Sequence, residues 1–311
     1  MKQPLSKEHP ELLPPLTTAT IERVKEGLEA ARDQEVDNQI QNALQQTTAI
    51  AENSPDDRIS GGVRRLVLRS LIYTLFRVKI DYPDRIPKHP GIVVANHLNH
   101  IDPLLLLAEL PGRPYYYTLG DARTLYNQGW KRHILRFSGG VIPLERLWKE
   151  EFAVIKAAKS GRQDLVDLAT EIEQDVPSGS AMQRLRQIER AVQSILAHQD
   201  GIILFPEGRL GKTEGRLHLP LKRGAAIYAL RAGVPIVPVA LIGTKNLYLR
   251  KELTLRFGQP LHFSQSNRPK RGEVDRVLEE IKQALIALLP EDYQEPQGLK
   301  LLHYFLNHMF Y

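Results

Sequence analysis

Three side chains that can hold or transfer a proton stand within six positions of one another in the stretch "VANHLNHIDPLLL", residues 94–106. They are His97, His100 and Asp102. An apolar run precedes them and a leucine-rich run follows, so they fall at the junction of two elements. Three interpretations fit: a metal site, surface histidines beside a helix cap, or an acid-base pair.

The spacing of these residues bears on each interpretation. His97, His100 and Asp102 could converge on one ion, but no neighbouring cluster of His, Asp or Glu completes a ligand set. Asp102 precedes Pro103 and an apolar run, which is typical of an N-cap aspartate with proline at the first helical position. An acid-base pair needs a histidine and a carboxylate that stabilises the imidazolium. His97 and Asp102 meet that need across a tight loop, and Asp102 can begin the helix as well.

Short apolar runs alternate with amphipathic stretches along the body of the chain. The runs predict buried strands at 91–96, 114–119, 139–144, 201–205, 234–243 and 253–261. The stretches between them predict helices at 103–110, 148–174, 181–198 and 223–232. This alternation is typical of an α/β layered fold, here a largely parallel or mixed sheet flanked by helices, with a helical N-terminal extension. His97 comes just past the first of these strands, where open α/β sheets collect functional groups.

Composition indicates how the chain is organised. Residues 1–60 predict an acidic helical extension whose narrow apolar stripe packs weakly on the body or pairs with a partner. The turn-rich stretch 51–62 marks the boundary of this extension. Residues 61–80 predict a basic amphipathic helix that contacts a membrane, and 81–265 form the main domain. Residues 266–311 predict a C-terminal helical region.

The helix expected at 64–80 combines basic and apolar residues. Arg65, Arg69 and Arg77 stand at spacings of four and eight and so share one helical stripe. The other side carries apolar residues: Leu68, Leu71, Ile72, Leu75 and Phe76. This profile fits a helix in a membrane interface with its arginines towards the headgroups, and equally a packing helix with a solvated basic edge. The aromatic and apolar C-terminal stretch 299–311 either docks on the core or touches the bilayer.

Charge is unevenly distributed along the chain. Residues 1–60 contain 6 Lys/Arg and 11 Asp/Glu, and the remainder contains 36 basic and 25 acidic residues. A basic body suits an anionic partner, but no nucleic-acid recognition module accompanies the charge, so we expect no nucleic-acid partner. The absence of cysteine excludes thiolate zinc sites and cysteine nucleophiles. We expect no signal peptide and no spanning helix, because no apolar run reaches about 18 residues.

Four segments resemble, in order, the motifs of the glycerolipid acyltransferases, the 1-acylglycerol-3-phosphate acyltransferase group. The first is His97 with Asp102 five residues later. The others are "SGGVIPLER" at 138–146, "LFPEGRLGKTEG" at 204–215 and "LKRGAAIYALRAGVPIVPVAL" at 221–241. Four ordered motifs are far more specific than any one of them. The resemblance covers roughly residues 80–262.

The resemblance implies an acyltransferase domain at 81–265, with an insertion at 148–180 that could serve as a lid or a membrane-contacting flap. It implies that His97 acts as general base and that Asp102 orients it. Glu207 would orient the cations that hold the phosphate of the acceptor. The substrate-binding residues that the resemblance implies are Arg146, Glu207, Gly208, Arg209 and Lys212.

The resemblance also implies a reaction. A fatty acyl group would pass from acyl-CoA or acyl carrier protein, as co-substrate, to the hydroxyl of a lysophospholipid, most directly 1-acylglycerol 3-phosphate, in phospholipid biosynthesis. No metal and no organic cofactor would be needed. Because these substrates are amphiphilic, we expect a peripheral protein that contacts the phospholipid surface on the cytoplasmic face of a membrane. Two alternatives stay open: another acceptor, such as glycerol 3-phosphate or a non-phosphorylated hydroxyl, or a non-catalytic membrane-binding protein of the same fold.

Two motifs depart from the family pattern. After Glu-Gly the family usually continues with a small residue, then Arg and Ser, whereas here Arg209 follows Gly208 directly. The phosphate-binding arginine has therefore moved one place, or its role has passed to Lys212, Arg216, Lys222 or Arg223. In the first motif Asn99 stands where Ser is frequent, and His100 is an unusual inner residue. These departures put the identity of the acceptor in doubt more than the type of reaction.

Overall fold

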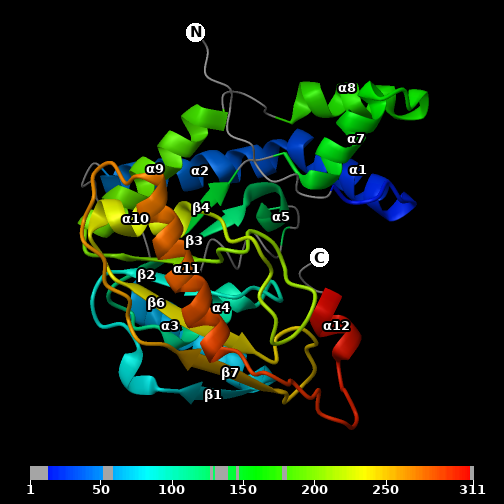
Figure 1. Ribbon diagram of the computed structural model, residues 1–311. Helices are drawn as coiled ribbons and strands as arrows, with labels where there is room; N and C mark the ends of the chain where they lie inside the picture. Colours follow the sequence, from blue (N-terminus) through cyan, green and yellow to red (C-terminus); the bar gives the residue numbers. More distant parts are fainter. Residues whose placement is uncertain are drawn as a thin grey trace.

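The computed structural model describes residues 13–51, 59–126, 129, 139–144, 147–176 and 181–308. Within them the chain forms a seven-stranded sheet in the order β1-β7-β6-β2-β5-β3-β4. The strands are β1 (Arg77–Asp81), β2 (Ile92–Ala95), β3 (Tyr116–Asp121), β4 (Val141–Leu144), β5 (Gly201–Leu204), β6 (Ile236–Ile242) and β7 (Glu252–Phe257). The predicted α/β fold is confirmed, and the sheet is mixed (Figure 1).

Strand direction decides where functional groups gather. β2 pairs in parallel with β5 and β6, and β3 pairs in parallel with β5 and β4. β7 runs antiparallel to β6, and β1 is parallel to β7. The carboxyl ends of β2 to β6 therefore meet at one edge of the sheet, which we call the carboxyl edge, and β1 and β7 begin there. Every residue of β2, β5 and β6 is buried, as expected for parallel strands covered on both faces.

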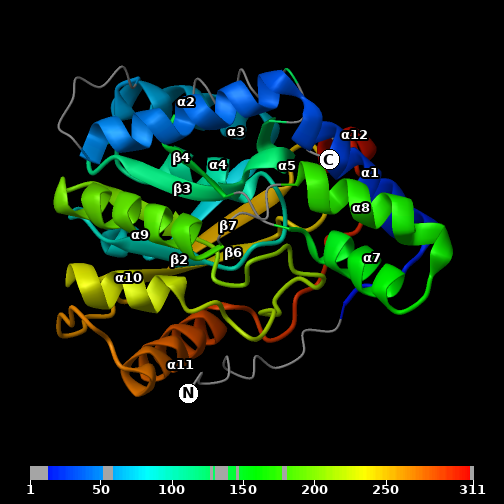
Figure 2. The ribbon, with the colours of Figure 1, turned by 90° about the horizontal axis from the view of Figure 1, so that it is seen from above.

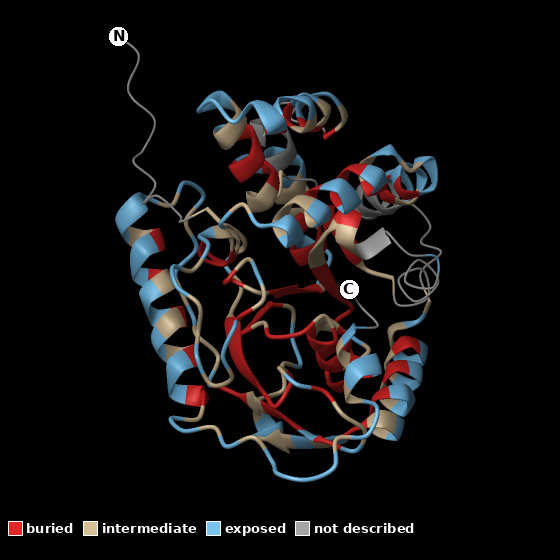
Figure 3. Cartoon of the chain, turned by 90° about the vertical axis from the view of Figure 1, so that its right-hand side faces the viewer, coloured by how far each residue is buried: buried red, intermediate tan, exposed pale blue. Residues whose placement is uncertain are grey.

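Helices cover both faces of the sheet (Figures 1 and 2). One face carries α3 (Gly61–Leu75), α4 (Asp102–Glu109) and α12 (His303–His308), and the other carries α9 (Ala181–Ala197), α10 (Gly224–Ala232) and α11 (Arg271–Leu288). The remaining elements are α1 (Thr18–Arg32), α2 (Gln34–Ala51), α5 (Ala122–Tyr126), α7 (Lys149–Lys159), α8 (Val166–Asp175) and the 3-10 turns η1 (Pro83–Arg85) and η2 (Gln163–Leu165). Figure 3 shows the buried strands enclosed by helices whose outer sides are exposed. None of the described helices is long and apolar enough to cross a bilayer.

The predicted helix at 64–80 is shorter and differently oriented than its sequence suggested. α3 ends at Leu75, and Arg77 already pairs with Glu252 in the sheet, so the placement of Arg77 on a helical stripe was wrong. Leu68 and Ile72 face the core, as a packing helix requires, but Leu71 is 44% exposed. The helix ends early because residues 77–81 pair with β7 as a strand. Helical periodicity does not reveal such a non-local pairing.

Two of the three arginines of α3 are tied to the body of the protein. Arg64 is buried, lies over the ring of Tyr115 and donates to the carbonyl of Tyr116. Arg69 forms an ion pair of 2.7 Å with the fully buried carboxylate of Glu109 on α4. Burial raises the pKa of Glu109, although the charge of Arg69 opposes that shift. These contacts fix the packing of α3 on α4.

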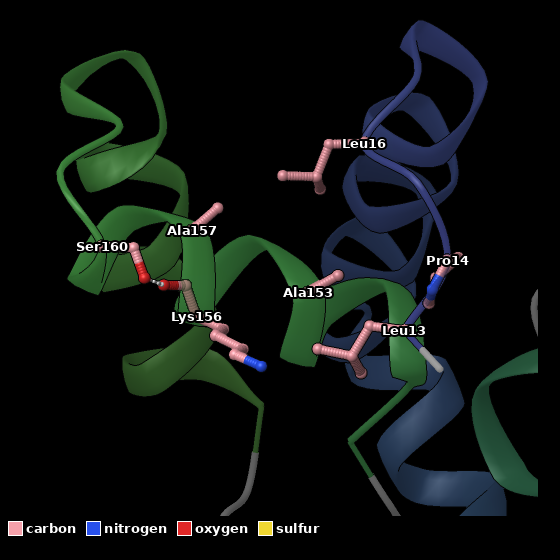
Figure 4. Close-up of a pocket in the computed structure, with 7 residues that line it drawn as sticks. All are labelled: Leu13, Pro14, Leu16, Ala153, Lys156, Ala157 and Ser160. Atoms are coloured by element: carbon pink, nitrogen blue, oxygen red, sulfur yellow. Dashed lines mark hydrogen bonds between the residues drawn. The ribbon is translucent and has the colours of Figure 1, made fainter. Parts of the chain in front are cut away.

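The N-terminal extension packs against the insertion. The predicted helix at 148–174 is two helices, because Gly161 adopts φ +103° after α7 and the chain turns back through η2 into α8. α1 packs on this pair through an apolar cluster of its own: Val24, Leu28, Val154, Ile155, Leu165, Ala169, Ile172 and Val176. A shallow pocket lies where the segment before α1 meets α7, lined by Leu13, Pro14, Leu16, Ala153, Lys156, Ala157 and Ser160 (Figure 4).

A buried polar cluster ties this helical unit to the sheet. Trp148 packs on Gly27 of α1 and donates from its ring nitrogen to Asp121 at the carboxyl end of β3. Arg123 binds both oxygens of the buried Glu151 and also donates to the carbonyl of Gly27. The extension and the insertion, which the sequence resemblance does not cover, thus stand together beside the carboxyl edge.

Candidate active site

The site begins where β2 ends. Asn96 follows the strand and is fully buried, and its side chain both donates to the carbonyl of Leu241 at 2.9 Å and accepts from the amide of Leu241 at 2.8 Å. These two bonds imitate a further pair of the sheet ladder on β6. They lock the residue before His97, so His97 leaves the sheet in a defined direction at the carboxyl edge.

His97 and Asp102 form a hydrogen-bonded pair. The Nδ1 atom of His97 lies 2.9 Å from Oδ2 of Asp102, whose side chain is fully buried. The same oxygen accepts from the amides of Leu98 at 2.7 Å and Asn99 at 2.9 Å. The carboxylate is thus held by three donors in one tight loop, which gives it the geometry to orient the imidazole.

The predicted N-cap role of Asp102 is wrong. Ile101 is the N-cap of α4, and Asp102 is its first residue, followed by Pro103. Its carboxylate turns back to amides upstream of the helix instead of capping amides within it. The carboxylate still lies at the helix N-terminus, where the helix dipole favours negative charge.

The ring of His97 is packed on one side and remains partly exposed. It stacks on Phe205, with ring centroids 4.1 Å apart, and keeps a side-chain exposure of 17%. Because Nδ1 faces Asp102, Nε2 is the nitrogen available to a substrate. The ring of His100 lies edge-on, with its centroid 6.5 Å away. In the part of the chain that the structure describes, no group of three His, Asp or Glu side chains is placed to hold a metal ion.

Glu207 holds the backbone of His97. Its two oxygens accept from the amides of His97 and His218, each at 2.8 Å. Burial raises the pKa of Glu207, although the two backbone donors stabilise its charged form. A third bond closes the arrangement, because Gly211 donates to the carbonyl of His97 at 2.6 Å. Glu207 was expected to orient cations, and it is placed to do so only through His218, whose ring contacts Arg209.

The basic residues predicted to bind substrate lie around the following loop. Gly208 has φ +66°, a conformation that disfavours any side chain, and an added Cβ would meet the side chain of Lys222 at 3.1 Å. Arg209 and Lys212 are exposed. Arg209 contacts the ring of His218, and Lys212 follows Gly211, whose amide binds His97. Arg146 lies outside the described residues, so its predicted role stays a prediction.

A second buried glutamate clamps the same loop to β6. Glu214 accepts from the amides of Gly243 at 2.9 Å and Lys245 at 3.1 Å. Burial raises its pKa as well. Lys245 donates from its Nζ atom to the carbonyl of Gly211 at 3.2 Å. The loop beside His97 is therefore fixed at both ends by carboxylates that bind backbone amides.

Four residues of this arrangement were not identified from the sequence. Asn96 could have been noticed as a polar residue that ends an apolar strand. His218, Glu214 and Lys245 carry no local signal, because their importance comes from contacts between loops that are distant in the chain. Chemically, the site offers a base at Nε2, a carboxylate that orients it, and basic side chains on a rigid loop nearby.

Comparisons with known proteins agree with this chemistry. A family model described as Acyltransferase matches residues 77–242. The chain is 25% identical over 203 residues to 1-acyl-sn-glycerol-3-phosphate acyltransferase alpha of Homo sapiens, which covers 63% of this chain and 57% of that protein. It is 26% identical over 199 residues to a probable 1-acyl-sn-glycerol-3-phosphate acyltransferase of Mycoplasma pneumoniae, which covers 63% and 60%. The matched stretch thus spans less than two thirds of either relative.

Among solved structures, the crystal structure of the 1-acyl-sn-glycerophosphate acyltransferase from Thermotoga maritima is similar. The TM-score is 0.43 at 19% identity, over 72% of this chain and 81% of that one. The family model matches more than half of the chain, and the matched residues include the His97–Asp102 pair at the end of β2. The chain therefore belongs to the acyltransferase family.

Proposed function

We propose that this protein transfers a fatty acyl group from an acyl thioester to the hydroxyl of a lysophospholipid, with 1-acylglycerol 3-phosphate as its main acceptor. The observation that carries the proposal is the hydrogen bond between Nδ1 of His97 and Asp102, which leaves Nε2 as the nitrogen of that ring that can act on a substrate. The names of the curated relatives support the class of acceptor.

The proposed reaction is a direct transfer. Nε2 of His97 takes the proton of the acceptor hydroxyl while the oxygen attacks the thioester carbonyl. The carbon–sulfur bond then breaks, and the thiolate that leaves takes up the proton from His97. Asp102 stabilises the imidazolium between these steps. Such general-base assistance contributes on the order of 10²–10⁴ in rate. We propose that no metal and no organic cofactor takes part.

We propose that the phosphate of the acceptor binds on the basic loop next to His97. Arg209 is exposed and contacts His218, whose backbone shares Glu207 with the backbone of His97. Charge-assisted bonds from a guanidinium to phosphate are short and directional, so they would hold the hydroxyl near Nε2. Lys212 and Arg146 are further candidates for the same role.

The acyl donor and the cellular location belong to the same proposal. Acyl-CoA and acyl carrier protein are both suitable thioesters, and each meets the protein from the aqueous side. We propose that the protein works as a peripheral enzyme on the cytoplasmic face of a membrane, with α3 as a contact. The amphiphilic acceptor supports this proposal, because it resides in the bilayer.

An acceptor panel tests the proposal. The full chain would be assayed with palmitoyl-CoA and palmitoyl carrier protein against lysophosphatidic acid, glycerol 3-phosphate and lysophosphatidylcholine. We expect lysophosphatidic acid to be acylated fastest. Preferred turnover of glycerol 3-phosphate or of a non-phosphorylated hydroxyl would favour the alternative acceptors. The shifted position of Arg209 in the third motif is the reason to test them. Inactivity towards every acceptor would favour a non-catalytic membrane protein.

A variant separates the phosphate from the rest of the acceptor. We expect Arg209→Gln to raise KM for lysophosphatidic acid by roughly 10- to 100-fold, since a charged hydrogen bond contributes about 1.5–3 kcal/mol. Turnover of an acceptor without phosphate would change little. Arg162→Gln is the matched control, because Arg162 is an exposed arginine in the turn after α7. Equal effects of both substitutions would rule out phosphate binding by Arg209.

A further inference from the structure

Exposed apolar side chains are concentrated in two short segments. Of the fourteen large apolar side chains that are exposed in the described residues, nine belong to these segments. Four lie on the outer side of α3: Val63, Leu66, Val67 and Leu71. Five lie in or next to α12: Leu299, Leu301, Leu302, Tyr304 and Phe305. Monomeric proteins rarely expose such groups together unless something binds them.

α12 is held firmly although its outer side is apolar. Leu306 is buried in the core, and Asn307 exchanges two hydrogen bonds of 2.8 Å with the backbone of Leu247. The amide of Leu249 donates to the carbonyl of Leu301 at 2.9 Å. The exposure of Tyr304 (76%) and Phe305 (58%) is therefore a property of a docked element, and these side chains are presented outward.

The two segments belong to one face of the molecule. The loop that binds Leu301 also binds the end of α3, because Arg250 donates from its amide to the carbonyl of Leu75 and from its side chain to that of Tyr73. Both α3 and α12 lie on the α4 side of the sheet, away from α11 (Figures 1 and 2). We call this surface, made of the outer side of α3 and residues 299–305, the apolar face.

The apolar face adjoins the carboxyl edge. Asn307 of α12 binds the backbone of Leu247, which lies in the connection that follows the carboxyl end of β6. The end of α3 lies at the carboxyl edge, since β1 begins there immediately after it. A surface that covered this face would therefore lie beside the site that His97 occupies.

Charge identifies the kind of surface that fits. Residues 58–80 and 296–311 contain no aspartate or glutamate, whereas both stretches contain lysine or arginine. Arg77 and Arg250 are exposed near the junction of the two segments. An apolar strip with aromatic side chains and a basic border matches the interface of an anionic bilayer, where rings lie at headgroup depth.

We propose that the C-terminal segment 299–308 is a second membrane anchor, which inserts together with α3 into the surface of an anionic bilayer and places the carboxyl edge against it. This inference rests on the proposed function, because the proposed acceptor is a lipid that the bilayer supplies. The docking itself is measurable without any turnover.

The test is vesicle binding of the full chain. Leu299→Gln/Tyr304→Gln/Phe305→Gln removes three side chains from the apolar face, and all three are so exposed that folding should persist. The control is Tyr82→Gln/Ile286→Gln, which removes two exposed apolar side chains outside both the apolar face and the insertion at 148–180. Far-UV circular dichroism melts would verify that both variants fold. Binding would be measured by co-sedimentation with phosphatidylcholine vesicles that contain or lack phosphatidylglycerol.

We expect the control to bind like the wild type and the apolar-face variant to bind at least about 10-fold more weakly. Binding of the wild type should rise with phosphatidylglycerol and fall with salt. Equal binding of the two variants would overturn the proposal. The proposal would also be overturned if the wild type were a dimer in lipid-free solution and the apolar-face variant a monomer, because a second copy would then cover the face.

Turnover of a short-chain, monomeric lysophosphatidic acid separates this inference from the proposed function. We expect the apolar-face variant to keep that turnover and to lose at least about 10-fold on acceptor embedded in vesicles. If the wild type turns over no acceptor yet its vesicle binding depends on these side chains, the proposed function fails and the anchor stands. If turnover on vesicles is unaffected, the anchor fails and the function stands.

Discussion

Glu207 is the residue for which structure and sequence resemblance lead to different expectations. The resemblance assigns it to the cations that bind phosphate, whereas the structure has both of its oxygens accepting backbone amides, one of them from His97. Glu207→Gln keeps the size of the side chain but replaces one acceptor by an NH₂ group. One of the two amides then faces a donor and loses its hydrogen bond.

The size of the effect follows from burial. A hydrogen bond to a charged group is worth about 1.5–3 kcal/mol. Burial raises the pKa of Glu207, so the carboxylate is costly to bury and a neutral amide recovers part of that cost. We therefore expect the lower end of the range. If that loss displaces His97, it corresponds to roughly a 10-fold fall in kcat.

The assay is steady-state acyl transfer to lysophosphatidic acid, with kcat and KM measured separately. Glu214→Gln is the matched control, because Glu214 is also buried and also binds two backbone amides, those of Gly243 and Lys245. We expect kcat to fall in Glu207→Gln with KM nearly unchanged, and the control to fall clearly less. A rise in KM at constant kcat would refute the reasoning and restore the predicted role of Glu207 in orienting cations.

Two further predictions concern stability. In Gly27→Ala the new Cβ would lie 2.6 Å from the ring of Trp148, so we expect the free energy of unfolding, measured in urea, to fall by about 1–3 kcal/mol. Gly272→Ala is the control, because a Cβ there would have nothing within 4 Å, and it should not destabilise the protein. Equal stabilities of the two variants would contradict the packing of α1 on Trp148. Burial would raise the pKa of Glu295, but hydrogen bonds and charge from Lys251 outweigh it and hold that pKa below the ordinary 4.5. The wild type should therefore be more stable than Glu295→Gln above about pH 4.5, and the difference should vanish as pH falls through the lower folded-state pKa; a difference that is constant with pH would disprove the charge effect.

Much of the fold was predictable because its signals are local. The buried strands β2, β5 and β6 are continuous apolar runs, and α4 and α10 are apolar stretches that start next to a proline and a glycine. β1 was missed, since its pairing with β7 involves residues far along the chain. Local pattern and non-local pairing compete at such places, and the pairing prevails.

The chemistry of the candidate site could be predicted from the sequence, but the contacts that hold its residues in place could not. The His97–Asp102 pair could be proposed because the two residues are close in sequence. The role of Glu207 as a holder of His97 could not be, because it depends on how a loop after β5 folds over a loop after β2. The packing of Gly27 on Trp148 was equally invisible, since a glycine in a polar helix gives no sign of the ring above it.

The central claim is that His97 is the base of an acyl transfer. The most direct measurement is the rate of palmitoyl transfer from palmitoyl-CoA to lysophosphatidic acid by the wild type, His97→Ala and His100→Ala. His100 is the control, because its ring lies 6.5 Å from that of His97 in the same loop. We predict that His97→Ala loses on the order of 10²-fold or more in kcat, while His100→Ala stays within a few-fold of the wild type. A His97→Ala variant that turns over like the wild type would contradict the account.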